Sequence, residues 1–288
     1  MQLKQFLLQL YIFFAGACVG SFLNVCIYRL PQAKSIVRPR SMCPKCGNQI
    51  RAYDNIPILS FLWLRGHCRQ CNTPISLRYP LVEAMSGLFA LSIYLKFGLS
   101  PGGIVYYVFI ATLIVITYID IDYQIIPDVI SLPGIPIFFI ASLLLPYELL
   151  FPFENYDPLV KKIMVSVGLP SYPIIFKLLH STLGFLIGGG SLYIIAQAYC
   201  RLKQIEGMGG GDIKLLAMIG VLIGWTGVLT TIFVGSALGM LVGIASMVHQ
   251  RRLNMQLRIP FGPFLAIGAI TYIYFGVEII HWYFNQFR

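Results

Sequence analysis

The stretch GIVYYVFIATLIVITYID, residues 103–120, contains no charged side chain before its last residue, Asp120. Such a run predicts a membrane-spanning helix, because ~20 apolar residues at a rise of ~1.5 Å each cross a bilayer. Similar runs recur along the chain, and the one at 213–247 is too long for one span and is divided at Gly227. We therefore expect an all-α polytopic membrane protein with eight transmembrane helices, at residues 5–28, 80–98, 103–120, 128–146, 179–200, 213–227, 228–247 and 260–284.

The composition excludes an ordinary soluble domain. Hydrophobic residues make up 57% of the 288, charged residues only 11%, and the mean hydropathy is +0.76. Intrinsic disorder, a collagen repeat and a disulfide scaffold are excluded on the same grounds. The first apolar run is not followed by a small-residue cleavage site, so we interpret it as a span and not as a removed signal peptide.

The distribution of basic residues predicts the orientation in the bilayer. Lys and Arg outnumber Asp and Glu by 21 to 11, a net charge of +10. The positive-inside rule assigns the base-rich connections to the cytoplasm and the N-terminus to the outside. The charge thus reports topology, and no nucleic-acid partner is needed to explain it. Fifteen bases lie in the cytoplasmic connections: Arg29, Lys34, Arg38, Arg40, Lys45, Arg51, Arg65, Arg69, Arg78, Arg201, Lys203, Lys214, Arg251, Arg252 and Arg258.

Two polar segments interrupt the spans and suggest a division of the chain. We expect a first transmembrane helix at 1–30, a cytoplasmic insertion at 31–79 and a seven-helix membrane domain at 80–288. The second polar segment, 147–178, falls on the outer side in this topology.

The insertion contains two matched cysteine pairs, Cys43-Pro-Lys-Cys46 and Cys68-Arg-Gln-Cys71, separated by 21 residues. Each C-x-x-C presents two thiolates to one tetrahedral ion, so the two pairs predict a closed four-sulfur site, with zinc as the expected metal. A disulfide is the less favoured use in the reducing cytosol. A closed shell leaves no open position for a substrate, so we expect the metal to be structural.

Carboxylates are few, so those at membrane edges are informative. The predicted topology brings Asp120, Asp122, Asp128 and Asp212 to the cytoplasmic edge, and ionisable groups beside a membrane suggest function. Asp120 and Asp122 point in directions ~200° apart around a helix, so both cannot face one centre. Asp128 stands at the head of a predicted helix, where a helix cap is its simplest role, and Asp122 suits a solvated charge or a partner for a loop arginine.

Asp212 ends the sequence Gly209-Gly210-Gly211-Asp212, in which glycines allow the backbone to bend and to approach a neighbouring chain. A glycine-rich turn with a capping aspartate is the structural alternative. Two carboxylates that meet in a low-dielectric site share one proton, so that one activates water while the other protonates a scissile carbonyl. Pairing Asp120 with Asp212 is therefore an aspartyl-protease hypothesis. The chain has no H-E-x-x-H motif, and a serine–histidine pair is the weaker option.

Together these motifs resemble the type IV prepilin peptidases, a family of bifunctional leader peptidases and N-methyltransferases with a GxGD-type aspartyl motif. The resemblance spans nearly the whole chain and includes the four cysteines and the aspartates. It also includes Gly20-Ser-Phe-Leu-Asn-Val25, Tyr28-Arg-Leu-Pro31, Arg78-Tyr-Pro-Leu-Val-Glu83 and Gly207-Met-Gly-Gly-Gly-Asp-Ile-Lys-Leu215.

The resemblance implies a catalytic dyad of Asp120 and Asp212 in a bacterial inner-membrane enzyme. Its substrates would be prepilin or pseudopilin precursors, which carry a short basic leader ending in glycine before an apolar helix. After cutting at the cytoplasmic face, the family methylates the new N-terminus with S-adenosylmethionine. By analogy we expect that cofactor near the cysteine pairs and Gly66.

Two further charged residues are candidates for supporting roles. Glu83 is a local acid that recognises the substrate, or a partner for Arg78 or Arg29. Lys214 tunes the dyad, or extends toward the interface. Because a basic enzyme face does not attract a basic leader, we expect recognition through the apolar helix and local acids. The alternatives are an aspartyl intramembrane peptidase without methyl transfer, and a non-enzymatic zinc-stapled scaffold or transporter.

Overall fold

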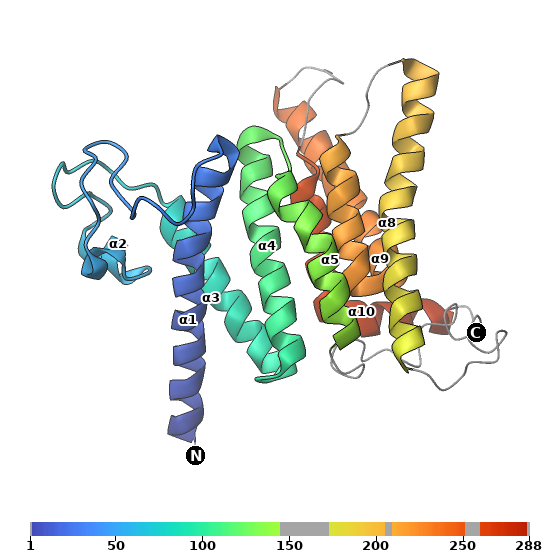
Figure 1. Ribbon diagram of the computed structural model, residues 1–288, viewed down its shortest axis with the longest axis horizontal. Coiled ribbons are helices and arrows are strands. Elements are labelled where there is room, and N and C mark those ends of the chain that lie inside the picture. Colours follow the sequence, from blue (N-terminus) through green and yellow to red (C-terminus); the bar gives the residue numbers. More distant parts are fainter. Residues whose placement is uncertain (1, 145–172, 205–208, 251–259, 287–288) are drawn as a thin grey trace. The chain divides into compact units, whose positions relative to one another are not determined.

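The helices of the computed structural model form where the apolar runs predict them (Figure 1). Residues 2–144, 173–204, 209–250 and 260–286 are described. Most of the polar segment 147–178, and the basic residues Arg251, Arg252 and Arg258, lie outside these residues. The long helices are α1 (Gln2–Arg29), α3 (Arg78–Phe97), α4 (Pro101–Tyr123), α5 (Asp128–Leu144), α8 (Pro173–Lys203), α9 (Gly210–Gln250) and α10 (Gly262–Gln286).

Helix α9 consists of two helices joined at Gly224, which has a non-helical φ of 70° and ψ of −176°. A Cβ atom on Gly220 would lie 2.9 Å from Cγ2 of Val228, whereas residues eight apart in one straight helix are separated by about 12 Å. The imidazole of His180 lies directly against Gly224, so a side chain there would overlap it. The long apolar run is divided as expected, but at Gly224 and not at the predicted Gly227.

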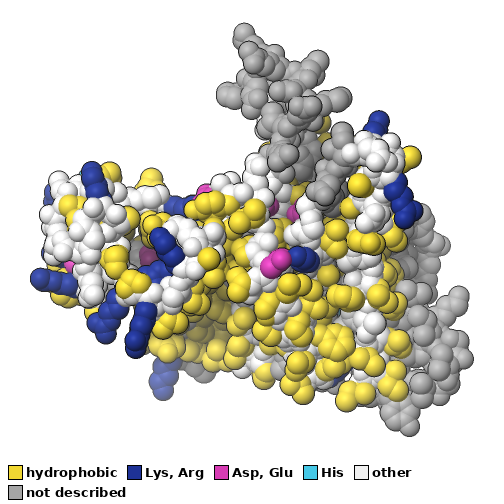
Figure 2. All heavy atoms as spheres, turned by 45° about the horizontal axis from the view of Figure 1, so that its top comes forward, with side chains coloured by type: hydrophobic (Ala, Val, Ile, Leu, Met, Phe, Trp, Pro, Cys, Tyr) yellow, Lys and Arg dark blue, Asp and Glu magenta, His cyan; other side chains and the backbone are white. Residues whose placement is uncertain are grey.

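Five helices, α1, α3, α4, α8 and α9, are long and apolar enough to cross a membrane, while α5 and the first part of α10 are shorter and apolar. When the two parts of α9 are counted separately, the described residues contain eight apolar helical segments, long and short together. Their outward faces carry exposed Leu, Ile and Phe side chains, and hydrophobic side chains cover much of the helical surface in Figure 2. Lipid is the environment in which such faces are stable. The chain is an all-α polytopic membrane protein.

The chain divides into two units, residues 1–119 and 120–288, and the division falls within α4. In the first unit α1 packs closely on α3. A Cβ atom on Gly20 would lie 2.7 Å from Cα of Glu83, and the hydroxyl of Ser86 donates to the carbonyl of Gly16 over 2.7 Å. Small residues at such positions let helix backbones approach in a membrane, where packing and polar contacts drive association.

The insertion follows α1 and contains η1 (Leu30–Gln32), η2 (Ala52–Asn55) and the short helix α2 (Leu59–Trp63). The guanidinium of Arg29, at the end of α1, donates to the carbonyls of Ser35 and Pro39 over 2.9 and 2.8 Å. These bonds fold the first part of the insertion back onto the end of α1. Lys and Arg side chains gather over this part of the molecule in Figure 2.

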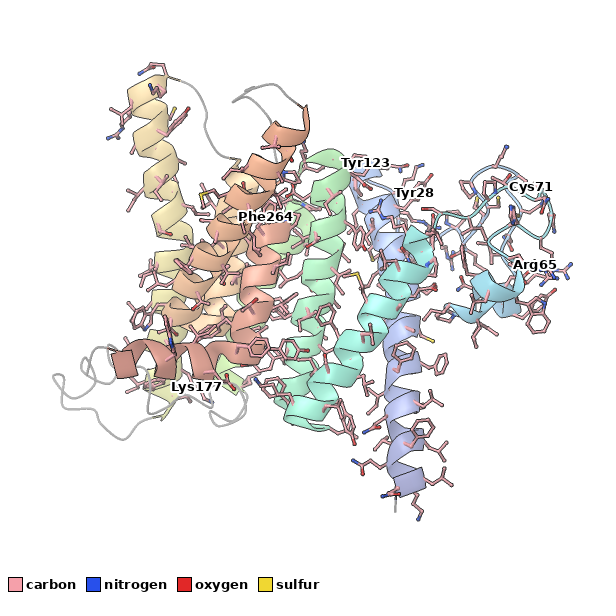
Figure 3. All side chains as sticks on the ribbon, turned by 180° about the vertical axis from the view of Figure 1, so that it is seen from behind. Tyr28, Arg65, Cys71, Tyr123, Lys177 and Phe264 are labelled. Atoms are coloured by element: carbon pink, nitrogen blue, oxygen red, sulfur yellow. The ribbon has the colours of Figure 1, made fainter. Side chains whose placement is uncertain are left out.

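The second unit is built around the first half of α9. Its side chains Leu215, Leu216, Met218, Ile219 and Leu222 are fully buried. Glycines of α8 and α9 meet backbone to backbone at Gly184 and Gly220. Figure 3 shows Tyr123 and Phe264 toward one end of this unit and Lys177 toward the other.

Candidate functional site

Asp120 and Asp212 come from different helices of the second unit and lie close enough to interact electrostatically. Asp120 is in the last turn of α4 and is only 5% exposed, whereas Asp212 is in the first turn of α9 and is partly buried. The two carboxylates that the sequence singles out are thus neighbours at the end of α4 and the start of α9.

A third chain segment reaches the same site. The backbone N–H of Gly262, the first residue of α10, donates to Oδ2 of Asp120 over 2.9 Å. The first N–H groups of a helix have no partner inside the helix, so they favour a nearby carboxylate. A Cβ atom on Gly262 would lie 2.7 Å from the same oxygen, which leaves room for glycine alone. This bond fixes the plane of the Asp120 carboxyl group.

The three glycines before Asp212 differ in what surrounds them. A Cβ atom on Gly211 would lie 2.8 Å from Cβ of Ile126, which belongs to the turn between α4 and α5. A Cβ atom on Gly210 would meet open space, and one on Gly209 would lie 3.8 Å from Oδ2 of Asp212. None of the three has a left-handed φ. Gly211 therefore serves close approach: it lets the start of α9 reach the turn that follows Asp120.

This difference in surroundings predicts different effects on thermal stability for two neighbouring variants. We expect Gly211→Ala to lower the thermal unfolding temperature of the protein in detergent, because overpacking costs about 1–3 kcal/mol. Gly210→Ala should leave the temperature unchanged or raise it slightly, since alanine restricts the unfolded chain. Differential scanning fluorimetry of both variants checks this. Equal behaviour of the two would contradict the contact with Ile126.

The other candidate charges near the site have partners or lie outside it. Nζ of Lys214 binds both carboxylate oxygens of Asp128, over 2.7 and 2.8 Å. The side chains of Lys214 and Asp128 are 36% and 57% exposed, so the ion pair contributes at most about 1 kcal/mol. Asp128 is therefore an ion-pair partner at the head of α5, and Asp122 is exposed on α4.

The four cysteines of the insertion converge. The sulfur atoms of Cys43, Cys46, Cys68 and Cys71 all lie within 4.8 Å of one another, and those of Cys43 and Cys71 are 3.7 Å apart. Four sulfurs at about 2.3 Å from a central zinc would be about 3.8 Å apart. The four thiols therefore fit a tetrahedral metal ion.

The backbone repeats the same loop around each cysteine pair. Cys43 N–H donates to the carbonyl of Asn48 over 2.9 Å, and Cys68 N–H donates to that of Thr73 over 2.8 Å. Each loop turns through a left-handed residue directly after its second cysteine, Gly47 or Asn72. Glycine and asparagine tolerate that conformation best.

Hydrogen bonds also prepare two of the four thiols to bind a metal. The side chain and backbone N–H of Thr73 bind the sulfur of Cys71 and lower its pKa to about 6. Backbone N–H groups of Cys46 and Lys45 lower the pKa of Cys43. The thiolate is the metal-binding form, so these bonds favour metal binding by Cys43 and Cys71.

Gly66 and Glu83 have local structural partners within the first unit. Gly66 has a φ of 72°, and a Cβ atom on it would lie 3.1 Å from the ring of Phe61. Glu83 is 9% exposed, and its Oε2 accepts the backbone N–H of Ile58 over 2.7 Å. Ile58 has a φ of 62°, which is rare for a β-branched residue, so Glu83 holds a strained turn of the insertion on α3.

Sequence patterns gave no role to Gly262, Ile126 or Ile58. Only the first has a local signal: Gly262 stands between two prolines in Pro260-Phe-Gly-Pro263, at the head of the last apolar run. Ile126 and Ile58 are ordinary apolar residues in sequence, and only their contacts distinguish them.

Family models match two parts of the chain. Residues 14–97 match the bacterial peptidase A24 N-terminal domain, and residues 107–244 match the type IV leader peptidase family. The first match includes the four cysteines and Glu83, and the second includes both aspartates. No solved structure matches the chain.

Curated relatives resemble the chain over nearly its whole length. A prepilin leader peptidase/N-methyltransferase of Aeromonas hydrophila is 33% identical over 300 residues, covering 96% of this chain and 93% of its own. A protein of the same name from Pseudomonas putida is 34% identical over 286 residues, covering 92% and 89%. A third, from Myxococcus xanthus (strain DK1622), is 35% identical over 246 residues, covering 85% and 65%. The chain belongs to the type IV leader peptidase family.

Proposed function

We propose that the protein cleaves the short basic leader from type IV prepilin or pseudopilin precursors and methylates the new N-terminal residue. The observation that carries this proposal is the proximity of Asp120 and Asp212, one at the end of α4 and one at the start of α9. The relatives named prepilin leader peptidase/N-methyltransferase support the same function.

In the proposed reaction the two carboxyl groups share one proton, and each has one task. The ionised group takes a proton from water as the water oxygen attacks the scissile carbonyl carbon. The protonated group gives its proton to the carbonyl oxygen. When the tetrahedral intermediate collapses, the C–N bond breaks, the leaving amine takes a proton from the dyad, and one hydroxyl group of the intermediate returns its proton to the dyad as the carbonyl re-forms. The N–H of Gly262 keeps the carboxyl group of Asp120 oriented throughout.

The insertion would carry the second activity. Its four thiolates, from Cys43, Cys46, Cys68 and Cys71, would hold one zinc ion that stabilises its fold. S-adenosylmethionine would supply the methyl group. The expected position of that cofactor near Gly66, and the division into segments 1–30, 31–79 and 80–288, remain predictions.

We further propose that the N-terminus lies outside and the active site lies at the cytoplasmic face. The 15 bases of the cytoplasmic connections support this orientation. Cleavage at that face suits a precursor whose basic leader stays in the cytoplasm while its apolar helix sits in the bilayer.

Reconstitution of the purified protein with a prepilin precursor and labelled S-adenosylmethionine tests the proposal. We expect loss of the leader after its last glycine and the gain of one methyl group on the new N-terminus, both read by mass spectrometry. Cleavage without label would favour a peptidase without methyl transfer. A protein that binds zinc but leaves the precursor intact would favour a scaffold.

Gly262→Ala should impair cleavage without removing either aspartate. The added methyl group would lie 2.7 Å from Oδ2 of Asp120, so the carboxyl group must move. A misplacement of about 1 Å in the catalytic geometry costs up to about 10²-fold in rate. Initial rates of precursor cleavage check this, with Gly190→Ala in α8, where the added methyl group meets nothing within 4 Å, as the control for adding a methyl group. An unchanged rate for Gly262→Ala would contradict the role of this contact.

A further inference from the structure

The short helix α2 of the insertion exposes large apolar side chains on one face. Leu59, Leu62 and Trp63 stand at positions i, i+3 and i+4, which lie on the same side of a helix. All three are exposed, and Trp63 is 82% exposed. A cluster of large exposed apolar side chains marks a surface that meets another partner. We call these three side chains the α2 face.

Hydrogen bonds fix the level of α2 along α1. The backbone N–H of Ile58, directly before α2, donates to Oε2 of Glu83, and the side chain of Ser21 in α1 donates to the same carboxylate. Ser21 is eight residues before Arg29, the last residue of α1, so α2 begins about 12 Å back from that end along the helix axis. Figures 1 and 3 both show α2 at the level of the second half of α1 and not beyond its end.

This level is inside the bilayer. Helix α1 has 28 residues and is about 42 Å long, which is the thickness of a bilayer with its headgroups. The headgroup layer on each side is about 6 Å thick, so a point about 12 Å from the end of α1 lies just inside the hydrocarbon. A helix with one apolar face is stable there when it lies in the plane of the membrane with that face toward the acyl chains.

The charge of the insertion fits an anionic lipid surface. Residues 31–79 contain eight bases and a single acid, Asp54, which is itself paired with Arg69 over 2.6 Å. Arg65 is exposed two residues after α2, and a side chain of this length reaches headgroups while its stem stays in apolar surroundings. Clusters of bases beside a membrane attract acidic phospholipids. The eight bases are Lys34, Arg38, Arg40, Lys45, Arg51, Arg65, Arg69 and Arg78.

We propose that α2 is an interfacial helix, with the α2 face in the acyl layer and the bases of the insertion on acidic phospholipid headgroups. The insertion is then partly embedded in the membrane. This inference concerns how the insertion is held, and it does not depend on the proposed function. A second copy of the chain or another protein is the competing occupant. It would have to cover a surface at the level of Ser21, inside the bilayer, where lipid is the surrounding medium.

Tryptophan fluorescence tests this placement. Trp225→Phe with Trp282→Phe leaves Trp63 as the sole tryptophan of a chain that contains three. In liposomes of phosphatidylcholine and phosphatidylglycerol, we expect Trp63 to lose fluorescence to lipids brominated in their acyl chains and to be protected from aqueous acrylamide. Thermal unfolding checks that the variant is folded.

The matched control moves the tryptophan within the insertion. Val37 is 77% exposed, but Arg29 binds the carbonyls of Ser35 and Pro39 on either side of it, so Val37 lies at the end of α1. In the same background, Val37→Trp with Trp63→Phe should show the reverse pattern, with loss of fluorescence to acrylamide and little loss to brominated lipid.

The pattern of quenching decides between lipid, water and protein as the neighbour of the α2 face. We expect weaker lipid quenching of Trp63 in phosphatidylcholine alone and at high salt, because both weaken the attraction of bases to the membrane surface. Quenching by acrylamide but not by lipid would place the α2 face in water and overturn the proposal. Protection from both quenchers would place a protein surface, such as a second copy, over it and would also overturn the proposal. Equal lipid quenching without phosphatidylglycerol would refute the role given to the bases.

Discussion

Asp212→Asn is expected to reduce leader cleavage by at least about 10²–10⁴-fold, the usual contribution of a general acid or base. Asparagine keeps the size of the side chain but neither accepts nor releases a proton at neutral pH. Asp120→Asn should have a similar effect, because the two groups act as one unit and losses in such units are not additive. Initial rates of precursor cleavage, followed by mass spectrometry, measure both.

The matched control for these variants is Asp122→Asn. Asp122 lies two residues after Asp120 on the same helix, but it is exposed. Its replacement should leave cleavage unchanged. Methyl transfer to a substrate supplied already cleaved should survive in Asp212→Asn, which shows that the variant is folded. Retained cleavage in Asp120→Asn or Asp212→Asn would refute the proposed dyad.

The second large effect is expected from the double variant Cys43→Ser, Cys46→Ser. Removing one pair leaves two thiolates, too few to close a tetrahedral shell, and a structural zinc ion contributes about 10–16 kcal/mol to folding in isolated zinc-binding peptides. We expect the bound zinc to fall from one equivalent per chain to near zero, as measured by mass spectrometry of the metal. Cys18→Ser with Cys200→Ser, outside the cluster, should retain it.

Loss of zinc should affect the two activities unequally. The insertion belongs to the first unit, whereas Asp120 and Asp212 belong to the second. Methyl transfer should therefore fall more than leader cleavage when the cysteine pair is removed. An equal fall in both would show that the insertion also supports the peptidase site. Full zinc in the double variant would show that the four-sulfur site is wrong.

Local patterns were enough to predict the fold class and the cysteine cluster. Each apolar run becomes a helix because a helix satisfies its own backbone hydrogen bonds in lipid, whatever its neighbours are. The spacing within each C-x-x-C brings two sulfurs together in one turn, and the two turns of the insertion do meet. The position of the break in α9 was less well predicted: it falls at Gly224, where φ is left-handed and where His180, from another helix, leaves room for glycine alone.

The sequence by itself determined the helices, their apolar faces, the cysteine cluster and a short set of candidate aspartates, since all of these depend on residues near one another in the chain. Only the tertiary structure decided which carboxylates meet. Asp120 is 92 residues from Asp212 and 142 from Gly262, and their approach depends on the contact of Gly211 with Ile126 and on a bond to the first N–H of α10. Packing between helices depends on shape at the contact, and a hydrophobic pattern along one helix does not specify the shape of another.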